Sequence, residues 1–361
     1  MGCHERPRTS SWKPTRENEM RMVQNEIGRS PGKLRSGWIR ISWCIFSGYL
    51  LSAQTSAVVT ANILAGGETD LPADTPSGRL DTEGTFSFVG ALAISSGGGN
   101  YKGSAVALSR EWVLTAGHNA DLNDDGLPDS TWSGAFHLPG KGVFNVTQAF
   151  THPGFTGFGN PSVNDDLALL RLATPLPVGM GFPSLGSAAS IGDFITLVGF
   201  GRSGYGSYGY TSNASLTDRR FGSNVIDGFQ IDDEGSGRAE VFRYDFDAPS
   251  TVGILGGSLG NDIETIIGPG DSGGAALRQT ASGWELIGIN TYTEGYGGRF
   301  GDTGGGVLVE PYMDWISQTT GIPEPSNIVL TLLSALLMLR RKRSVSDDRV
   351  DRVGSQLGAA R

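Results

Sequence analysis

The sequence predicts an all-β fold built from short strands and many turns. Glycine accounts for 55 of the 361 residues, and regular helical periodicity is scarce. Short apolar runs bounded by glycine, such as residues 194–198, are typical of buried strands in a barrel or sandwich. Hydrophobic residues make up 38% of the chain and charged residues 18%, which supports one large core or two small ones and excludes a disordered chain.

The net charge of −9 is unevenly distributed. Residues 1–57 hold nine Lys/Arg and four Asp/Glu, residues 321–361 hold seven and four, and 12 basic and 29 acidic residues lie between them. A central region this acidic is not attracted to nucleic acid or anionic lipid by its net charge. We therefore expect no nucleic-acid partner, and we interpret the basic ends as targeting signals.

The N-terminal segment has the layout of a secretory signal. Basic residues up to Arg40 precede an apolar run at 41–51, and small residues follow at 52–57. A charged region, a short apolar core and a small-residue site together predict cleavage by signal peptidase. A buried core strand is the alternative. We assign residues 1–61 to a leader and residues 62–320 to the working domain.

Both cysteines, Cys3 and Cys44, fall in that leader. The domain at 62–320 would then fold without a disulfide, which a chain of about 260 residues can do. This cysteine usage fits an exported bacterial protein and argues against a vertebrate secreted one.

The C-terminal segment, residues 321–361, resembles the PEP-CTERM sorting signal of certain Gram-negative bacteria. It contains Pro323-Glu-Pro325, an apolar run at 328–339 and a basic cluster at 340–343, although eighteen residues follow the cluster where such proteins usually stop. The resemblance implies an exosortase-type sorting enzyme as a partner. A plain membrane anchor is the alternative, but twelve apolar residues fall short of the roughly 20 that a membrane-spanning helix needs. We expect export across the inner membrane to the cell envelope, the outer surface or the medium.

Two segments supply a candidate base and a candidate acid. The apolar run 112–116 leads into Gly117 and His118, an arrangement that can place an imidazole at the rim of a barrel. Asp165 and Asp166 directly precede the apolar run 167–170. A carboxylate partly desolvated in this way can fix a histidine tautomer and stabilise the imidazolium, and both aspartates compete for the role. The other histidines, His4, His137 and His152, have no evident partner, and we interpret them as structural.

A third segment supplies a candidate nucleophile. Ser272 lies in Gly268-Pro-Gly-Asp-Ser-Gly-Gly274, where flanking glycines allow a tight turn and leave room for a substrate backbone. The same turn can aim the amides of Gly270 and Ser272 at one point and form an oxyanion hole. The order His, Asp, Ser along the chain also differs from the orders that subtilisins and α/β-hydrolases use.

Together these motifs resemble the trypsin/chymotrypsin family of serine proteases. The matching strings are Thr115-Ala-Gly-His118, Asp166-Leu-Ala-Leu169 and Gly270-Asp-Ser-Gly-Gly-Ala275. Weaker matches are Val198-Gly-Phe-Gly201 and the helix-like Tyr312-Met-Asp-Trp-Ile316. The resemblance implies a chymotrypsin-like double β-barrel over about residues 84–318, with the active site between the barrels and a short C-terminal helix. Its register assigns the acid to Asp166, and it implies a protein or peptide substrate.

The resemblance also implies a specificity pocket beside the nucleophile. The residue six before Ser272 is Ile266, so a preference for Lys or Arg is not expected. Thr291 and Thr293 match the substrate-binding strand, with Thr293 at a position where glycine usually leaves the pocket open, and Gly306 keeps the other wall small. These residues predict a shallow, uncharged pocket for small or medium apolar side chains.

The resemblance also implies a way in which the protease is activated. There, a freed N-terminal Ile or Val pairs with the acid before the nucleophile, which is Asp271 in this chain. Ile63 could supply such a terminus, but Asn62 precedes it rather than a basic residue. Either another protease cleaves there or the site forms without that ion pair.

An acidic segment after His118 has the spacing of half a calcium loop. Asp121, Asn123, Asp125 and Asp129 alternate around Gly126, an arrangement that can gather oxygens around one cation. The twelfth position is Trp132 instead of a bidentate glutamate. Structural calcium and an unoccupied acidic surface turn both remain open, and no cofactor is required for the proposed chemistry.

The sequence therefore predicts an exported serine endopeptidase that works through an acyl-enzyme. Two alternatives use the same fold: a catalytically silent adhesion or matrix protein of the cell surface, and an esterase that uses the same three residues.

Overall fold

The computed structural model describes residues 79–159, 162–247, 259, 264–295 and 297–323. All of them belong to one compact unit, Thr55–Arg361. The predicted leader, Ile63 and the C-terminal sorting segment lie outside the described residues. Within the described part of the chain, every helix is too short or too polar to cross a membrane.

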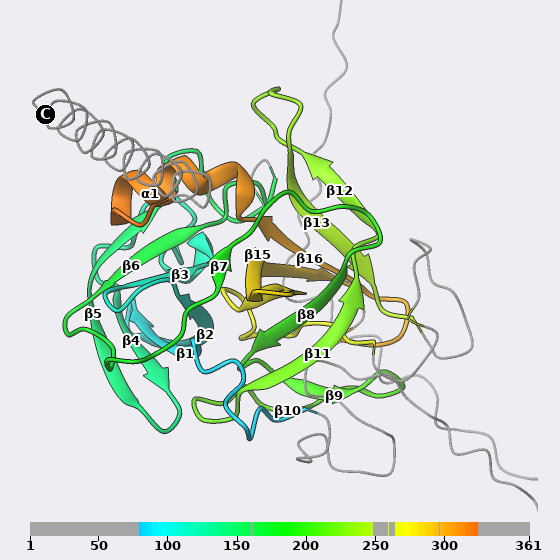
Figure 1. The fold of residues 1–361 in the computed structure, drawn as a ribbon, viewed down its shortest axis with the longest axis horizontal. Helices are drawn as coiled ribbons and strands as arrows, with labels where there is room; N and C mark the ends of the chain where they lie inside the picture. The colour runs from blue at the N-terminus through cyan, green and yellow to red at the C-terminus, as the bar shows by residue number, and fades with distance from the viewer. Residues whose placement is uncertain (1–78, 160–161, 248–258, 260–263, 296, 324–361) are drawn as a thin grey trace, which may run out of the picture. The chain divides into compact units, whose positions relative to one another are not determined.

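Six strands close into a barrel, in the pairing order β1-β2-β3-β6-β5-β4 (Figure 1). Their bounds are β1 Val89–Ser96, β2 Gly99–Ala107, β3 Trp112–Thr115, β4 Ser133–Leu138, β5 Gly142–Thr151 and β6 Ala168–Leu172. Strand β6 is the apolar run that follows Asp166, and only Arg171 of its five residues is exposed. The strand pairs on both edges, with β3 and with β5, and its apolar side chains are buried.

The remaining strands form a second sheet of eight strands and a small two-stranded sheet. The large sheet has the order β11-β8-β14-β15-β16-β13-β12, and β7 pairs with β15. The bounds are β7 Ser184–Leu185, β8 Phe194–Gly199, β9 Ser203–Tyr205, β10 Gly209–Ser212, β11 Arg220–Val225, β12 Gly228–Ile231, β13 Ala239–Asp245, β14 Ala275–Thr280, β15 Gly283–Glu294 and β16 Thr303–Leu308. The strand predicted at 194–198 is confirmed as β8.

The predicted mostly-β, chymotrypsin-like architecture is confirmed, with one difference in how the two halves are built. The first half is a closed barrel, whereas the pairing in the second half runs from β11 to β12 without closing among the described strands. Strand β12 has only four residues, and a strand this short offers few backbone groups for a second partner.

The glycine- and serine-rich composition of residues 201–261 predicts long surface loops there, but strands also occur in this stretch. This glycine- and serine-rich stretch contains β9 to β13. Gly222 in β11 shows one reason, since a Cβ there would meet the side chain of Thr265 at 2.6 Å. Glycine at this position therefore permits a close approach of two segments instead of interrupting the strand.

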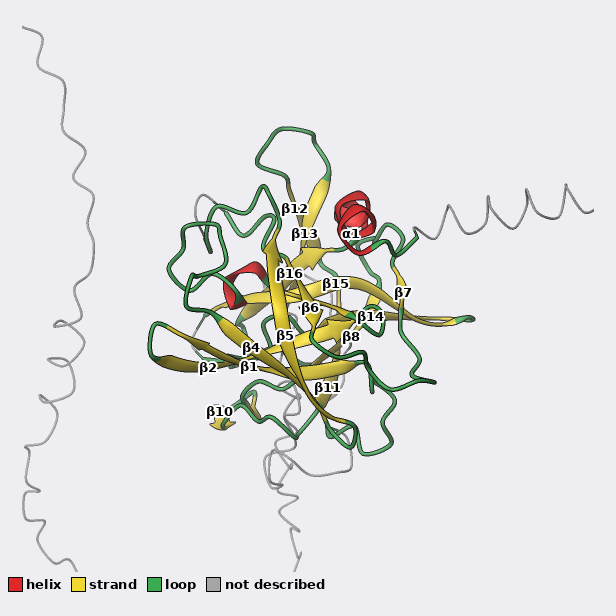
Figure 2. Cartoon of the chain, turned by 90° about the vertical axis from the view of Figure 1, so that its left-hand side faces the viewer, coloured by secondary structure: helices red, strands yellow, loops and turns green. Residues whose placement is uncertain are grey.

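A short helix ends the described chain. The 3-10 turn η2, Glu310–Tyr312, leads into α1, Met313–Thr320, which confirms the helix predicted around 312–316. Gly321 ends α1 in the left-handed conformation (φ 74°), a conformation that glycine adopts without steric cost. Figure 2 shows α1 beside the strands and the short η1 helix, Gly117–Asn119, within the barrel half.

Candidate active site

The barrel places His118 and Asp166 at the same end. Strand β3 runs into η1, which carries His118. A single residue, Leu167, separates Asp166 from the start of β6. Because β3 and β6 pair antiparallel with Thr115 opposite Ala168, the residues just beyond these two positions meet at one rim of the barrel.

Two bonds join His118 to Asp166. Its ring Nδ1 lies 2.7 Å from Asp166 Oδ2, and its backbone N–H donates to Oδ1 at 2.8 Å. The Asp166 side chain is fully buried, and the His118 side chain is 20% exposed. Burial alone would lower the pKa of His118, but the charge and hydrogen bond of Asp166 raise it above its ordinary value, with smaller contributions from Asp124 and Asp121.

An aromatic side chain that the sequence analysis did not single out covers the imidazole. The Phe158 ring centroid lies 4.6 Å from that of His118, at an interplanar angle of 56°. The backbone N–H of Phe158 donates to Asp124 Oδ1 at 3.3 Å. The acidic segment after His118 therefore contacts the segment that packs on the imidazole.

The turn that carries Ser272 is held by residues of the first barrel. Asn119 Nδ2 and the backbone N–H of Ser104 each donate to the Ser272 carbonyl oxygen at 2.8 Å. Gly273 has φ 86°, and a Cβ there would collide with Thr115 Oγ1 and the Ser104 carbonyl. Only glycine fits this close approach. Asn119 directly follows the predicted base, a signal that could have found it, whereas nothing in the sequence marks Ser104.

Ser272 itself is half-buried. Its hydroxyl donates to the Thr291 carbonyl at 3.4 Å, and among the described residues it makes no hydrogen bond to His118. Rotation about its Cα–Cβ bond is therefore needed before it can give a proton to the imidazole. The backbone N–H groups of Gly270 and Ser272 have no acceptor within the described part of the chain. They are thus available to bind an anionic oxygen.

Asp271 is fully buried beside this turn. Its carboxylate accepts hydrogen bonds from Gly201 N–H at 2.6 Å and from Gly268 N–H at 2.9 Å. Burial raises the pKa of Asp271 to about 7, although these two bonds and the charge of Arg220 act in the opposite direction. These are the interactions of Asp271 with the described residues, and the pairing predicted with Ile63 stays a prediction.

His152 has a partner, which corrects the interpretation that it had none evident. Its Nδ1 lies 2.9 Å from Asp165 Oδ1. The two adjacent aspartates that competed in the sequence thus pair with two different histidines, Asp166 with His118 and Asp165 with His152.

The residues predicted to form the specificity pocket differ in how much of each is exposed to solvent. Ile266 is fully buried in a core cluster with Phe246 and Ile267. Thr291 is 3% exposed and Thr293 is exposed. Gly306 lies opposite Asn290 in β15, and a Cβ there would collide with the Ile289 carbonyl. The pocket assignment stays a prediction.

The predicted calcium residues are engaged in hydrogen bonds within their own loop. Asp121 accepts from Gly126 N–H at 2.7 Å and from Asp125 N–H at 3.2 Å, and Asp129 accepts from Leu122 N–H at 3.1 Å. Asn123 Nδ2 donates to Asp125 Oδ2 at 3.1 Å. Among the described residues, three carboxylates converge within 4.8 Å only at Asp165, Glu234 and Glu240. Calcium at the 121–129 loop stays a prediction.

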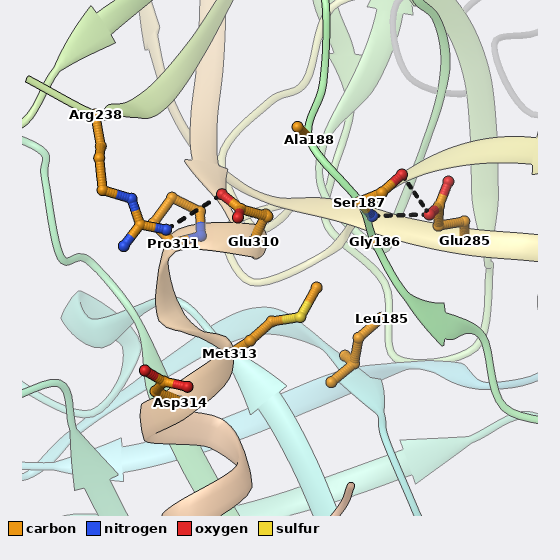
Figure 3. Close-up of a pocket in the computed structure, with 10 residues that line it drawn as sticks. All are labelled: Leu185, Gly186, Ser187, Ala188, Arg238, Glu285, Glu310, Pro311, Met313 and Asp314. Atoms are coloured by element: carbon orange, nitrogen blue, oxygen red, sulfur yellow. Dashed lines mark hydrogen bonds and ion pairs between the residues drawn. The ribbon is translucent and has the colours of Figure 1, made fainter. Parts of the chain in front are cut away.

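A separate hollow of about 480 Å³ lies beside β7 and η2 (Figure 3). Met313 and Leu185 line it, together with an ion pair of 3.3 Å between Arg238 and Glu310. None of its lining residues belongs to the His118, Asp166 and Ser272 group. This hollow is therefore distinct from the candidate active site.

Comparisons with known proteins found similarity in sequence to trypsins and one similar solved structure. Residues 76–234 match the family model described as Trypsin, a match that includes His118 and Asp166 but stops before Ser272. The chain is 27% identical to trypsin iota of Drosophila melanogaster over 187 residues, which is 51% of this chain and 65% of that protein. It thus spans less than two thirds of that relative. A solved structure titled HL collagenase is similar with a TM-score of 0.49 and 20% identity, covering 68% of this chain and 98% of the other. Residues 76–234 are therefore similar to the Trypsin family, and this similarity covers less than half of the chain.

Proposed function

We propose that this trypsin-like chain is an active serine endopeptidase, with Ser272 as nucleophile, His118 as its base and Asp166 as the residue that orients the base. One observation carries the proposal: two consecutive residues bind both other members of the group. His118 holds Asp166 through its ring and its backbone N–H, and Asn119 holds the Ser272 carbonyl.

The reaction would be acyl transfer through an acyl-enzyme. Ser272 Oγ attacks a peptide carbonyl as its proton passes to His118 Nε2, and the oxygen that becomes anionic is bound by the N–H groups of Gly270 and Ser272. The imidazolium then gives that proton to the departing amine, and the C–N bond breaks. Water attacks the ester in the same manner and regenerates Ser272. Asp166 stays ionised throughout and stabilises the imidazolium.

The substrate preference and the location belong to the same proposal. An uncharged residue at Ile266 and the threonines of β15 support cleavage after small or medium apolar side chains. The signal-like leader and the C-terminal segment support export to a bacterial cell envelope, with processing by signal peptidase and an exosortase-type enzyme. Calcium bound by the 121–129 loop would stabilise the segment that contacts Phe158.

A serine-directed fluorophosphonate probe tests the activity. We expect the purified protein to be labelled and to cleave an unstructured protein substrate, and Ser272→Ala to do neither. Equal labelling of both proteins, or labelling of neither, would favour the catalytically silent adhesion protein. Turnover of esters without any turnover of matched peptides would identify an esterase instead.

A further inference from the structure

The backbone just before Asp166 has an uncommon conformation. Asp165 has φ 59°, one of two positive values recorded for non-glycine residues in the described part of the chain. Its carbonyl accepts a hydrogen bond from Leu167 N–H at 2.6 Å, so Asp166 is the central residue of a three-residue turn. Aspartate and asparagine tolerate this left-handed region better than other side chains, yet it persists only where the surroundings fix it.

The surroundings of Asp165 are ordered on the barrel side. Its carboxylate, about 4% exposed, lies 2.9 Å from His152 Nδ1, and its backbone N–H donates to the Tyr312 hydroxyl at 3.1 Å. The His152 ring packs edge-on against Tyr312 at 4.8 Å and against Trp315 of α1 at 5.0 Å between centroids. These contacts hold both the side chain and the backbone N–H of Asp165.

Residues of the β12–β13 hairpin also lie close to Asp165. The carboxylate oxygens of Asp165, Glu234 and Glu240 lie within 4.8 Å of one another. The neighbouring Asn164 Nδ2 donates to Glu240 Oε2 and to the Ile231 carbonyl, both at 3.1 Å. Figures 1 and 2 show the hairpin of β12 and β13, which carries these groups, at the same edge as α1.

The groups around Asp165 favour its ionised form. Burial would raise the pKa of Asp165, but hydrogen bonds from His152, Glu234 and Tyr312 and the charge of His152 lower it. Burial and the charge of Asp165 raise the pKa of Glu234, and burial raises that of Glu240.

We propose that Asp165 is a positioning residue for the triad: its contacts with His152, Tyr312 and Glu234 keep the Asp165–Asp166 peptide in the orientation that presents Asp166 to His118. This inference rests on the proposed peptidase function. Asp166 binds His118 at two points, so rotation of the preceding peptide would disturb both bonds. Misplacement of a catalytic group by about 1 Å can cost on the order of 100-fold in rate.

The test compares Asp165→Ala with Asp165→Asn in the purified full chain. We expect Asp165→Ala to lower kcat by roughly 10- to 100-fold with KM nearly unchanged. Asp165→Asn should retain most of kcat, because asparagine tolerates a positive φ and its amide oxygen can accept from His152. A wild-type kcat in Asp165→Ala, or an equal loss in Asp165→Asn, would overturn the proposal.

A spectroscopic measurement separates this proposal from the peptidase function. The strongly deshielded Nδ1 proton resonance that His118 should show when paired with Asp166 is expected to move upfield in Asp165→Ala and to remain in Asp165→Asn. A wild type that cleaves nothing, yet shows this behaviour, would reject the peptidase and keep the positioning role. An active wild type whose resonance is unchanged in Asp165→Ala would reject the positioning role alone.

Two further variants control for folding. Asp81→Ala removes another buried aspartate, which pairs with Arg219 at 3.0 Å away from the triad; it should lose stability but keep kcat and the His118 resonance. If Asp165→Ala does not fold, His152→Ala removes the same pair without changing the turn. It should lower kcat by roughly tenfold and shift the resonance. Unchanged values in His152→Ala would overturn the proposal.

Discussion

Two histidine–aspartate pairs have aspartates that are adjacent in the sequence, and they differ in what surrounds the imidazole. The nitrogen–oxygen distances are 2.7 Å for His118–Asp166 and 2.9 Å for His152–Asp165, and the two histidine side chains are 20% and 19% exposed. The ring of His118, however, is next in the chain to Asn119, which binds the Ser272 turn, whereas Tyr312 and Trp315 pack on the ring of His152.

A histidine–aspartate pair is therefore not sufficient for catalysis. A carboxylate can orient an imidazole for chemistry or can fix a turn, and the distances alone do not separate the two roles. What separates them is the neighbouring segment, because the residue next to His118 binds the Ser272 turn, whereas His152 packs against Tyr312 and Trp315.

The largest difference between the pairs should appear when each aspartate becomes asparagine. Asp166→Asn removes the charge that stabilises the imidazolium and changes the His118 tautomer, so we expect kcat to fall on the order of 10⁴-fold. Asp165→Asn should stay close to the wild type. Steady-state kinetics on one peptide substrate measures both kcat values. An equal loss at the two positions would show that the two aspartates do not differ in role.

Adding a methyl group beside each aspartate should give a smaller difference. A Cβ at Gly154 would lie 2.6 Å from Asp165 Oδ2, whereas a Cβ at Gly117 would lie 3.1 Å from Asp166 Oδ1, a distance that a small shift relieves. We expect Gly154→Ala to lower kcat by roughly tenfold through Asp165, and Gly117→Ala to change it by less than about twofold. Thermal unfolding of both variants controls for loss of fold, and the reverse order of kcat would contradict the geometry.

The smallest effect concerns the charge environment of His118. Asp124 raises the pKa of His118, and its removal in Asp124→Asn should lower that pKa. Because the base acts unprotonated, the acid limb of the kcat/KM profile should move to lower pH, and only slightly, since Asp124 is exposed and screened by salt. High salt should shrink the difference from the wild type. A shift to higher pH would show that Asp124 acts through Phe158 and not through its charge.

The sequence predicted the strands and the local turns better than the contacts between distant segments. Strand β8 and helix α1 followed from apolar runs and motif spacing, since those signals are local. The strands between Ser203 and Asp245 were missed, because abundant glycine and serine hid a role in close packing that depends on a distant residue such as Thr265. The partner of His152 was missed for the same reason.

By itself, the sequence determined the residue types of the proposed triad, the order in which they occur, and the glycines around Ser272. Each of these is written in a short motif whose chemistry depends on its immediate neighbours. The chemistry of the residues alone left Asp165 and Asp166 open, because they are identical and adjacent, and only the resemblance of the motif favoured Asp166. In the tertiary structure it is Asp166 that binds His118. Asp165 has a left-handed backbone and contacts His152 just after β5, Tyr312 in η2 and the β12–β13 hairpin, and the two adjacent carboxylates bind different histidines.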